Sequence, residues 1–306
     1  MKIEYLSNER IDEFIAYCKK HKNEVDESFL YDEDLKEFKP NEDNPTFIIT
    51  NEENKIVATA SLVITSYYRK GKRAAFRIFH SEVDDLKYYK MLMEAVIKQA
   101  KDLEKVFVFV PIINKKLIGV MEELKFTVQR YSFFLVRKEM EVPDFIIPED
   151  YEIRPFRVGI DEEVWCEIRN SGFSKLKGSE TPMHPEMLKE MTSGSSYLEG
   201  GLMILYHKDR PVGVVRGGND IYEGVSVMDI GPLALIPEYQ GKGLGRILLR
   251  AAMKFAKEKN FEGTVLCVNA DNERAKTLYI NEGFKQVEAV VCYEYYLQVN
   301  NSYDKL

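Results

Sequence analysis

The sequence contains few cysteines, and they are widely spaced. The four are Cys18, Cys166, Cys267 and Cys292, and no CxxC pair occurs among the 306 residues. Disulfide-rich secreted domains have a high density of cysteines, and cysteine-based zinc sites usually have closely spaced pairs, so neither class is indicated. The histidines also show no ligand spacing; they are His21, His80, His184 and His207. We therefore expect reduced thiols, a cytoplasmic protein and no metal site.

Long apolar runs and an excess of positive charge are missing as well. No run approaches the roughly 18 apolar residues that span a bilayer, and the start at Met1 lacks a signal-peptide pattern. The formal net charge is −7 with a pI near 5.4, which disfavours nonspecific binding to nucleic acid. With 45% hydrophobic and 30% charged residues, we expect a globular protein without a membrane or nucleic-acid partner. Its length suffices for two domains.

The sequence does contain a glycine-rich turn between a predicted strand and a predicted helix. The turn reads Gln240-Gly241-Lys242-Gly243-Leu244-Gly245-Arg246. Strand-like residues 226–236 precede it, and apolar residues at the spacing of one helix face follow over 244–258. A glycine turn that opens a helix favours anions, because its free amides point outward and glycine lets a phosphate approach the backbone. Lys242 and Arg246 add positive charge, so the sequence predicts a phosphorylated ligand here.

The order of predicted elements repeats along the chain. After the helix at 244–258, the second half continues with a strand at 264–269, a helix near 272–281 and a strand over 286–297. The first half shows the same order at 73–79, 87–104, 106–110, 114–123 and 131–137. A shift of about 157 residues superimposes the two series, which indicates two copies of one domain rather than a chance alternation of elements. The polar stretch 141–150 has two prolines and reads as a linker between domains 1–140 and 151–306.

The two copies differ at the glycine turn. Three residues of the first copy fall on motif positions of the second: Asp84 on Gln240, Lys87 on Gly243 and Tyr89 on Gly245. The first copy therefore places Asp84 and Asp85 where phosphates would lie. A carboxylate about 4 Å from a phosphate charge costs about 4 kcal/mol at an effective dielectric constant near 20. The first domain is predicted to be a degenerate copy without a cofactor site.

Two motifs of the second half point to a family. Gln240, Gly243 and Gly245 match [Gln/Arg]-x-x-Gly-x-[Gly/Ala] between a strand and a helix, and Asn272 to Tyr279 with Gly283-Phe284 follow about 30 residues later. The phosphate motifs G-x-x-x-x-G-K-[ST] and G-x-G-x-x-G are absent. Residues 226–284 thus resemble the core of the GNAT superfamily of acyl-CoA-dependent N-acyltransferases. The resemblance implies an α/β (α+β) fold, in which each domain has a mixed, mostly antiparallel sheet flanked by helices.

A closer resemblance concerns the start of the second half. Ile153 to Arg157, Asp161 to Trp165, and Asn170-Ser171-Gly172-Phe173 are similar to the opening of the second domain in tandem GNAT proteins of the mycothiol synthase type. In that type a degenerate first domain is paired with an active second one. The substrate is not carried over from this resemblance. The lysine-rich composition is typical of proteins from AT-rich genomes, whereas mycothiol belongs to GC-rich actinobacteria.

The resemblance implies acetyl-CoA as co-substrate and assigns residues to it. The glycine turn would hold the pyrophosphate, and an amide on the preceding strand, at Leu235, would polarise the carbonyl. Asn269 and Asn272 would reach the pantetheine arm, although capping of the next helix is equally plausible for Asn272. The expected cofactor-binding set is Leu233, Leu235, Gln240, Gly241, Lys242, Gly243, Leu244, Gly245, Arg246, Asn269, Asn272 and Tyr279.

Two residues are candidates for proton transfer. Tyr279 matches the family's acid, which protonates the leaving thiolate; alternatively it packs against the cofactor. Asp229 lies eleven residues before Gln240, where several members carry a glutamate base, but it could also be a structural strand aspartate. Lesser candidates for the base are Asp220, Glu223 and Tyr293.

The predicted function is transfer of an acetyl group from acetyl-CoA to the primary amine of a small molecule. The loop-rich segment 172–201 would shape the acceptor cleft, with Trp165 and Phe173 either lining it or belonging to the core. The alternatives are a non-catalytic acyl-CoA binding or sensing protein and a protein or peptide N-acetyltransferase. The sequence does not distinguish a monomer from a homodimer.

Overall fold

The computed structural model describes residues 2–297, which form two compact units. Unit 1 comprises Met1–Tyr131 and Ala289–Leu306, and unit 2 comprises Ser132–Glu288. These units differ from the contiguous domains 1–140 and 151–306 predicted from sequence, and the predicted linker 141–150 lies inside unit 2. Sequence patterns report local structure, whereas the boundaries here are set by strands that pair far along the chain.

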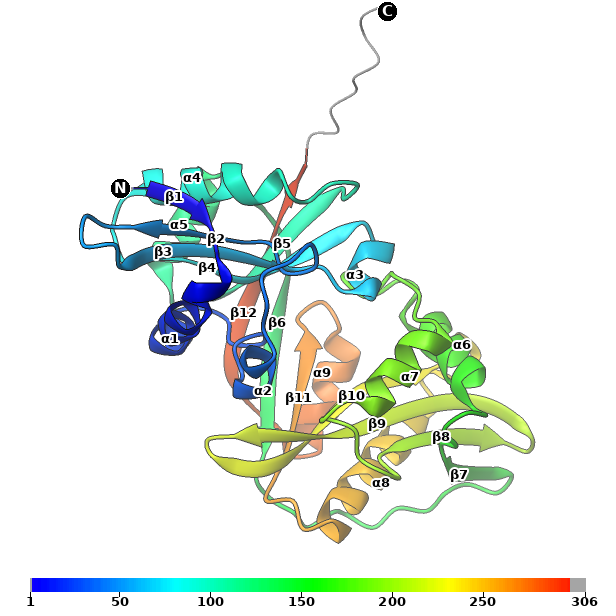
Figure 1. Ribbon diagram of the computed structural model, residues 1–306. Helices are drawn as coiled ribbons and strands as arrows, with labels where there is room; N and C mark the ends of the chain where they lie inside the picture. The colour runs from blue at the N-terminus through cyan, green and yellow to red at the C-terminus, as the bar shows by residue number, and fades with distance from the viewer. Residues whose placement is uncertain (1, 298–306) are drawn as a thin grey trace, which may run out of the picture. The chain divides into compact units, whose positions relative to one another are not determined.

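Two strands produce this difference. Strand β6 (Thr127–Arg137) starts in unit 1 and ends in unit 2, and β12 (Lys285–Tyr296) does the reverse. In unit 1, β12 pairs antiparallel with β5 (Lys105–Pro111), so the red strand lies beside the cyan-green one in Figure 1. In unit 2, β6 pairs antiparallel with β11 (Thr264–Asn269). Each copy of the repeat therefore contributes its last strand to the other unit.

The sheet of unit 1 has the strand order β1-β2-β3-β4-β5-β12. Its pairs are antiparallel except for β4 with β5, which are parallel. The remaining elements of this unit are β1 (Lys2–Tyr5), α1 (Ile11–His21), α2 (Asp32–Lys36), β2 (Thr46–Thr50), β3 (Ile56–Val63), α3 (Ser66–Lys70), β4 (Arg73–Ser81), α4 (Leu86–Ile97) and α5 (Lys115–Glu123). Helices α1 and α4 pack against the sheet over one apolar core.

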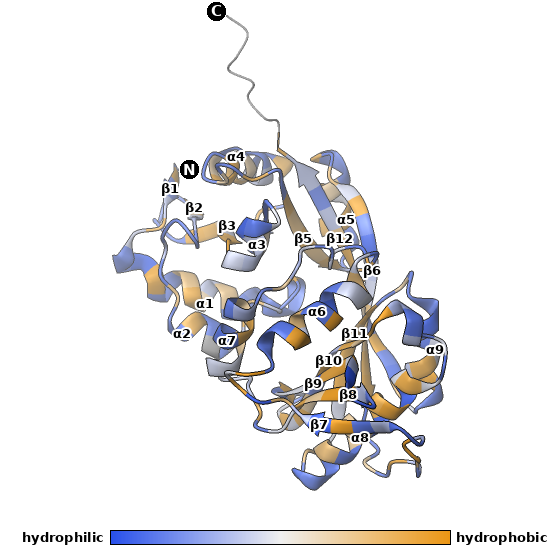
Figure 2. Ribbon diagram, turned by 90° about the vertical axis from the view of Figure 1, so that its right-hand side faces the viewer, coloured by the Kyte–Doolittle hydropathy of each residue, from blue (hydrophilic) through white to orange (hydrophobic). Residues whose placement is uncertain are grey.

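The sheet of unit 2 has the strand order β6-β11-β10-β9-β8-β7, again with one parallel pair, β10 with β11. Its further elements are β7 (Tyr151–Pro155), α6 (Glu162–Phe173), α7 (Pro185–Ser193), β8 (Leu202–His207), β9 (Arg210–Tyr222), β10 (Val225–Leu235), α8 (Leu244–Glu258) and α9 (Glu273–Asn281). In Figure 2 the central strands of this unit are largely apolar, whereas α6 and α9 mix apolar and polar residues. The predicted fold class, mixed and mostly antiparallel sheets flanked by helices, is confirmed.

Amphipathic patterning explains α8, the longest helix of the described residues. Its buried residues recur on one face and pack against β9 and β10: Leu244, Leu248, Leu249, Ala252, Met253 and Ala256. Such a face is the main source of helix stability in a globular protein. The predicted ranges 244–258 and 264–269 match α8 and β11 residue for residue.

One local prediction was wrong. The helix predicted over 87–104 ends at Ile97, because residues 98–104 form turns in which Asp102 has a φ of 61°. The segment 172–201 is loop-rich, as predicted, and also contains the short helix α7, which Pro185 opens at its first position, where proline fits a helix well. Within residues 2–297, no helix combines the length and the apolar character needed to cross a membrane.

Candidate functional site

The two parallel strands of unit 2 diverge close to the glycine turn. Among the described residues, β10 pairs with β11 only at Met228 and Asp229. Beyond that point β10 shifts register against β9 between Ile230 and Leu233, as a β-bulge does. The C-terminal end of β10 therefore stays paired with β9. On its other edge, towards β11, its backbone groups have no partner strand.

The divergence exposes one side of the backbone at Leu235. The Ile236 amide donates to Val212 O on β9 at 3.1 Å. Because successive amides alternate sides along a strand, the amides of Leu235 and Leu233 point away from β9, towards the gap. This orientation agrees with the predicted role of the Leu235 amide as donor to a carbonyl oxygen.

The end of β10 is held from two sides. Gln240 Nε2 donates to Leu235 O at 2.9 Å, which ties the strand to the following turn. On the other side α6 comes so close that a Cβ placed on Gly172 would lie 2.9 Å from Leu235 O and 3.4 Å from Leu235 N. Any side chain at 172 would have to displace β10 or α6. The absence of a side chain at Gly172 thus allows this close contact, which was not predicted from the sequence.

The glycine turn has the backbone that an anion site requires. Gly241 and Gly243 have φ of 78° and 81°, in the left-handed region that favours glycine. Gly243 is the N-cap of α8, and within the described residues no side chain caps this helix. The Arg246 amide already donates to Gly243 O at 3.1 Å, whereas the preceding amides of Leu244 and Gly245 have no intrahelical acceptor, so they and the helix dipole face outward at this end. A Cβ built on Gly243 would meet none of the described atoms within 4 Å.

The second motif lies directly against this turn. A Cβ on Gly245 would be 3.7 to 3.8 Å from the side chains of Leu278 on α9 and of Leu233 and Leu235 on β10. The start of α8, the end of β10 and the helix of the second motif therefore converge at one point. The fold brings together the two motifs that the sequence showed separately.

The two predicted cations near the turn lie in different environments, and a third cation accompanies them. Lys242 is exposed, with its ammonium 4.9 Å from the centre of the Tyr239 ring. Arg246 is engaged instead in an ion pair, with Nε 2.9 Å from Oε1 of the buried Glu282. Arg274 was missed, although it lies in the second motif: its guanidinium is 3.9 Å from the Cβ position of Gly241. Lys242 and Arg274 thus flank the turn, while Arg246 anchors α8.

Tyr279 is buried on α9 and packs edge-on against Phe284, with ring centroids 6.0 Å apart. Burial raises the pKa of Tyr279 to about 12, so the phenol keeps its proton at neutral pH. A protonated phenol is the form that an acid needs, and the packing expected in the alternative interpretation is present as well.

Asp229 is paired with an arginine that the sequence analysis did not consider. Arg216 on β9 donates through Nη1 to Asp229 Oδ2 at 2.9 Å and through Nη2 to Ser196 Oγ at 3.2 Å. Burial raises the pKa of Asp229 to about 6, and the guanidinium offsets this increase only in part. The sequence signal for this ion pair was an arginine, Arg216, followed by two glycines in an apolar strand. The glycines leave room for the guanidinium, since a Cβ on Gly218 would lie 2.3 Å from Arg216 Nη2.

The lesser candidates for the base lie in different environments. Asp220 is half-buried, and burial raises its pKa. Glu223 is exposed at the β9–β10 turn and forms an ion pair with Lys138 at 2.8 Å. Tyr293 is buried in the core of unit 1, where it packs against apolar side chains.

The two asparagines predicted to meet the pantetheine arm have structural partners. Asn272 is the N-cap of α9, and its side chain accepts from the Ala275 amide at 3.2 Å. Asn269 Nδ2 donates to Lys177 O at 2.9 Å and so anchors the loop that follows α6. Capping, the alternative for Asn272, is the role that the structure shows. Trp165 is fully buried in the core of unit 2, and Phe173 packs against that core.

Unit 1 has the corresponding elements without the anion site. Its parallel pair, β4 with β5, is recorded only from Arg73 to Ala75 within the described residues, and α4 follows β4 as α8 follows β10. The N-cap of α4 is Asp85, whose carboxylate accepts from the Lys87 amide at 2.8 Å. The helix end is thus capped by a negative charge of its own. Asp84 is exposed and lies 3.2 Å from the Lys116 ammonium.

Two histidines of unit 1 do converge, although their spacing in the sequence gave no sign of it. The rings of His21 and His80 stack with centroids 4.3 Å apart, and both lie next to Glu24. Helix α1 carries the first histidine and strand β4 the second, so only the packing of α1 on the sheet joins them.

Comparison with known proteins agrees with this geometry. Residues 163–284 match the model of the acetyltransferase (GNAT) family. The chain is 28% identical over 163 residues to a mycothiol acetyltransferase from Arthrobacter sp. (strain FB24), which covers 52% of this chain and 50% of that protein. A mycothiol acetyltransferase from Kytococcus sedentarius is 28% identical over 153 residues, 50% of this chain and 51% of the relative. The chain therefore spans about half the length of the curated relatives it matches.

Solved structures resemble almost the whole chain. A GCN5-related N-acetyltransferase from Sphaerobacter thermophilus aligns with a TM-score of 0.72 over 96% of this chain and 95% of that one, at 15% identity. A tandem GNAT protein from the clavulanic acid biosynthesis pathway aligns with a TM-score of 0.69 over 96% and 98%, at 10% identity. At these identities the likeness establishes the fold alone. Residues 163–284 therefore resemble the acetyltransferase (GNAT) family, and the fold resembles that of a tandem GNAT protein along nearly the whole chain.

Proposed function

We propose that unit 2 transfers an acetyl group from acetyl-CoA to the primary amine of a small molecule. The observation that carries this proposal is the pairing of an uncapped glycine turn at α8 with the diverging end of β10, where the Leu235 amide faces the gap. The turn offers amides to phosphates, and the strand offers one amide to a carbonyl oxygen. The family match over residues 163–284 supports the same chemistry.

Each step of the reaction is assigned to particular residues. The amides of the turn, flanked by Lys242 and Arg274, would hold the pyrophosphate of acetyl-CoA. The Leu235 amide would stabilise negative charge on the thioester oxygen as the amine nitrogen bonds to the carbonyl carbon, a contribution of about 3 kcal/mol for a typical donor of this kind. The C–S bond then breaks, and Tyr279 would give its proton to the leaving sulfur.

Asp229 would accept the proton that the amine loses, directly or through water. Its raised pKa, about 6, leaves it mostly ionised at neutral pH and makes it a stronger base than an ordinary aspartate. Its side chain is 35% exposed, so the carboxylate remains accessible beside its arginine partner. Arg216, which also contacts Ser196, would orient the carboxylate.

The acceptor is proposed to be a small molecule because the curated relatives carry the name mycothiol acetyltransferase. Helix α6 and the segment that contains α7 would wall its site, since α6 packs on β10 beside Leu235. Unit 1 would bind no acetyl-CoA, because Asp85 already caps the equivalent helix.

A non-catalytic acyl-CoA binding protein is the second candidate, favoured by the ion pair that engages Asp229. The test is an amine screen that follows release of free CoA thiol, run alongside calorimetry with acetyl-CoA. Release that depends on an added amine supports the transferase. Tight acetyl-CoA binding without release for any small amine or peptide would favour the binding protein, and release with peptides alone would favour a peptide N-acetyltransferase.

A further inference from the structure

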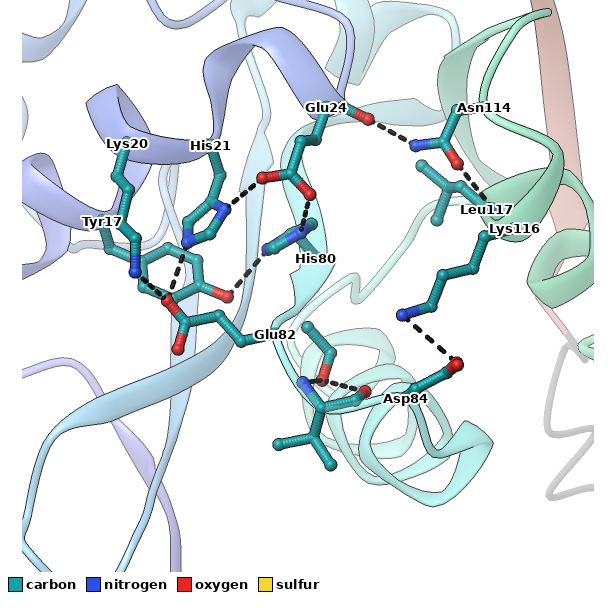
Figure 3. Close-up of polar contacts among 12 residues, drawn as sticks. Tyr17, Lys20, His21, Glu24, His80, Glu82, Asp84, Asn114, Lys116 and Leu117 are labelled. Atoms are coloured by element: carbon teal, nitrogen blue, oxygen red, sulfur yellow. Dashed lines mark hydrogen bonds and ion pairs between the residues drawn. The ribbon is translucent and has the colours of Figure 1, made fainter.

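Unit 1 contains a cluster of histidine and glutamate side chains that the proposed acyl transfer does not use. His21 ends α1, Glu24 ends the 3-10 turn that follows, and His80 lies on β4 (Figure 3). One ligand atom from each lies within 4.8 Å of the others. Both histidines are 5% exposed, whereas the Glu24 side chain is 55% exposed and gives the cluster access to solvent.

The hydrogen bonds around His80 determine which ring nitrogen carries the proton. The Tyr17 hydroxyl lies 3.2 Å from Val57 O, which can only accept, so Tyr17 donates there. Its oxygen then accepts from His80 Nδ1 at 2.8 Å, which assigns the ring proton to Nδ1. His80 Nε2 is left with a lone pair, and it faces the Glu24 oxygen Oε2 at 3.4 Å. Two acceptors that face each other repel unless a cation or a hydrogen-bond donor lies between them, and a metal ion is one such cation.

The groups that face one another suit a cation, because an imidazole lone pair and a carboxylate oxygen are donors that bind metal ions.

His21 differs from His80 in that both of its ring nitrogens lie close to carboxylates. Its Nε2 lies 2.8 Å from Glu82 Oε1, an oxygen that Lys20 also contacts at 2.7 Å. Its Nδ1 lies 2.7 Å from Glu24 Oε1. Only an imidazolium donates to both carboxylates at once, whereas a neutral ring that donates from Nε2 to Glu82 has a lone pair on Nδ1. A metal at Nδ1 would replace that second proton.

We propose that His21 Nδ1, His80 Nε2 and the Glu24 carboxylate bind one zinc ion, with solvent as the fourth ligand. Two imidazoles and one carboxylate with an open position form a donor set that zinc favours. Each histidine also has the outer partner typical of a metal ligand: Glu82 for His21, and Tyr17 for His80. The site is independent of the chemistry proposed for unit 2.

The geometry requires only a small adjustment. Zinc ligands at about 2.0 Å in a tetrahedron lie about 3.3 Å apart, close to the 3.4 Å between His80 Nε2 and Glu24 Oε2. The widest separation, within 4.8 Å, must close, and the exposed Glu24 side chain has the freedom to follow the metal. A bound ion would link the C-terminal end of α1 to β4 and so stabilise unit 1.

The test uses the full chain without a histidine tag, first stripped of metal with a chelator. Cobalt(II) is titrated while visible absorption is followed, and zinc is then added as competitor; calorimetry with zinc alone gives the stoichiometry. We expect one ion per chain, the intense visible bands of a four- or five-coordinate cobalt site, and loss of those bands as zinc displaces cobalt. Absence of stoichiometric binding, or thiolate charge-transfer bands that place the metal on cysteine, would overturn the proposal.

Matched variants locate the site. Glu24→Gln should weaken binding about tenfold or more, whereas Glu27→Gln, which removes an exposed carboxylate three residues away, should leave it unchanged. Tyr17→Phe keeps the ring but removes the outer partner of His80, and should weaken binding about tenfold. These variants avoid replacing a buried histidine. Equal affinity in wild type and Glu24→Gln would contradict the assignment.

Discussion

The two units differ most at the start of one helix. In unit 1, α4 begins with Asp85, whose carboxylate occupies an amide of the first turn; in unit 2, α8 begins with Gly243, and no described side chain caps it. The strands and helices around both points follow in the same order. The comparison shows that a helix end can change from an anion site to a self-capped terminus while the surrounding fold persists. An N-cap aspartate stabilises the helix and repels the phosphate in the same position.

The largest expected effect comes from transferring the cap of unit 1 to unit 2. Gly243→Asp should weaken acetyl-CoA binding at least about a hundredfold, because a carboxylate at the turn repels phosphate. Calorimetry measures the change. Gly243→Asn is the control: it causes similar backbone strain at φ 81° without the charge. If Asn weakens binding as much as Asp does, backbone strain and not charge separates the units.

Tyr279→Phe should lower kcat about a hundredfold while acetyl-CoA affinity changes little, because the phenol acts on the leaving sulfur. Turnover is followed by release of CoA thiol and affinity by calorimetry. Packing against Phe284 is preserved in the variant, so loss of structure should not contribute. A wild-type rate would leave Tyr279 with a packing role alone.

Gly172→Ala should lower kcat by about tenfold and destabilise unit 2 by about 1–3 kcal/mol, because its Cβ would press on Leu235 O at 2.9 Å. Thermal unfolding and CoA release measure the two effects. The matched control is Gly194→Ala, whose Cβ would come no closer than 3.5 Å to its neighbours. Equal behaviour of the two variants would mean that the close contact of α6 with β10 does not position the Leu235 amide.

The pH dependence tests Asp229. A base must be ionised, and its pKa is about 6, so kcat/KM should rise with pH up to about 6 and level off above it. Asp229→Asn should lower the rate and remove this limb of the profile. Asp220→Asn should retain the limb, although burial raises the pKa of Asp220 too. An unchanged limb in Asp229→Asn would assign the proton to another group.

The smallest effect is expected in unit 1. Asp84→Ala should leave acetyl-CoA affinity and stoichiometry unchanged, because its exposed carboxylate pairs only with Lys116 among the contacts recorded for it. Its cost in stability should stay below about 1 kcal/mol, as for other surface ion pairs. Weaker acetyl-CoA binding in this variant would show that unit 1 takes part in binding after all.

Local signals in the sequence predicted local structure well. The ranges of α8 and β11 followed from a glycine turn, one-face apolar spacing and a short apolar run, all of which act over a few residues. In the sequence, a glycine within a helix was the one indication of the close packing at Gly172. Its partner Leu235 lies more than sixty residues further along the chain. A spacing rule reports nothing about such a contact.

Features that depend on long-range packing were the ones missed. The exchange of β6 and β12 involves strands of similar apolar character, and pairing partners are not encoded in the period of either strand. The Arg216–Asp229 pair and the histidines of unit 1 meet only through the packing of neighbouring elements. For the same reason, the sequence could lack a short-range ligand motif although His21 and His80 converge in the fold.

The most direct test of the contrast between the units is the stoichiometry of acetyl-CoA binding to the full chain. Calorimetry should give one site per chain in wild type, and no measurable binding in Gly243→Asp at the same concentrations. Two sites in wild type, or a site that persists in Gly243→Asp, would contradict the account, because both results would place acetyl-CoA somewhere other than the turn at α8.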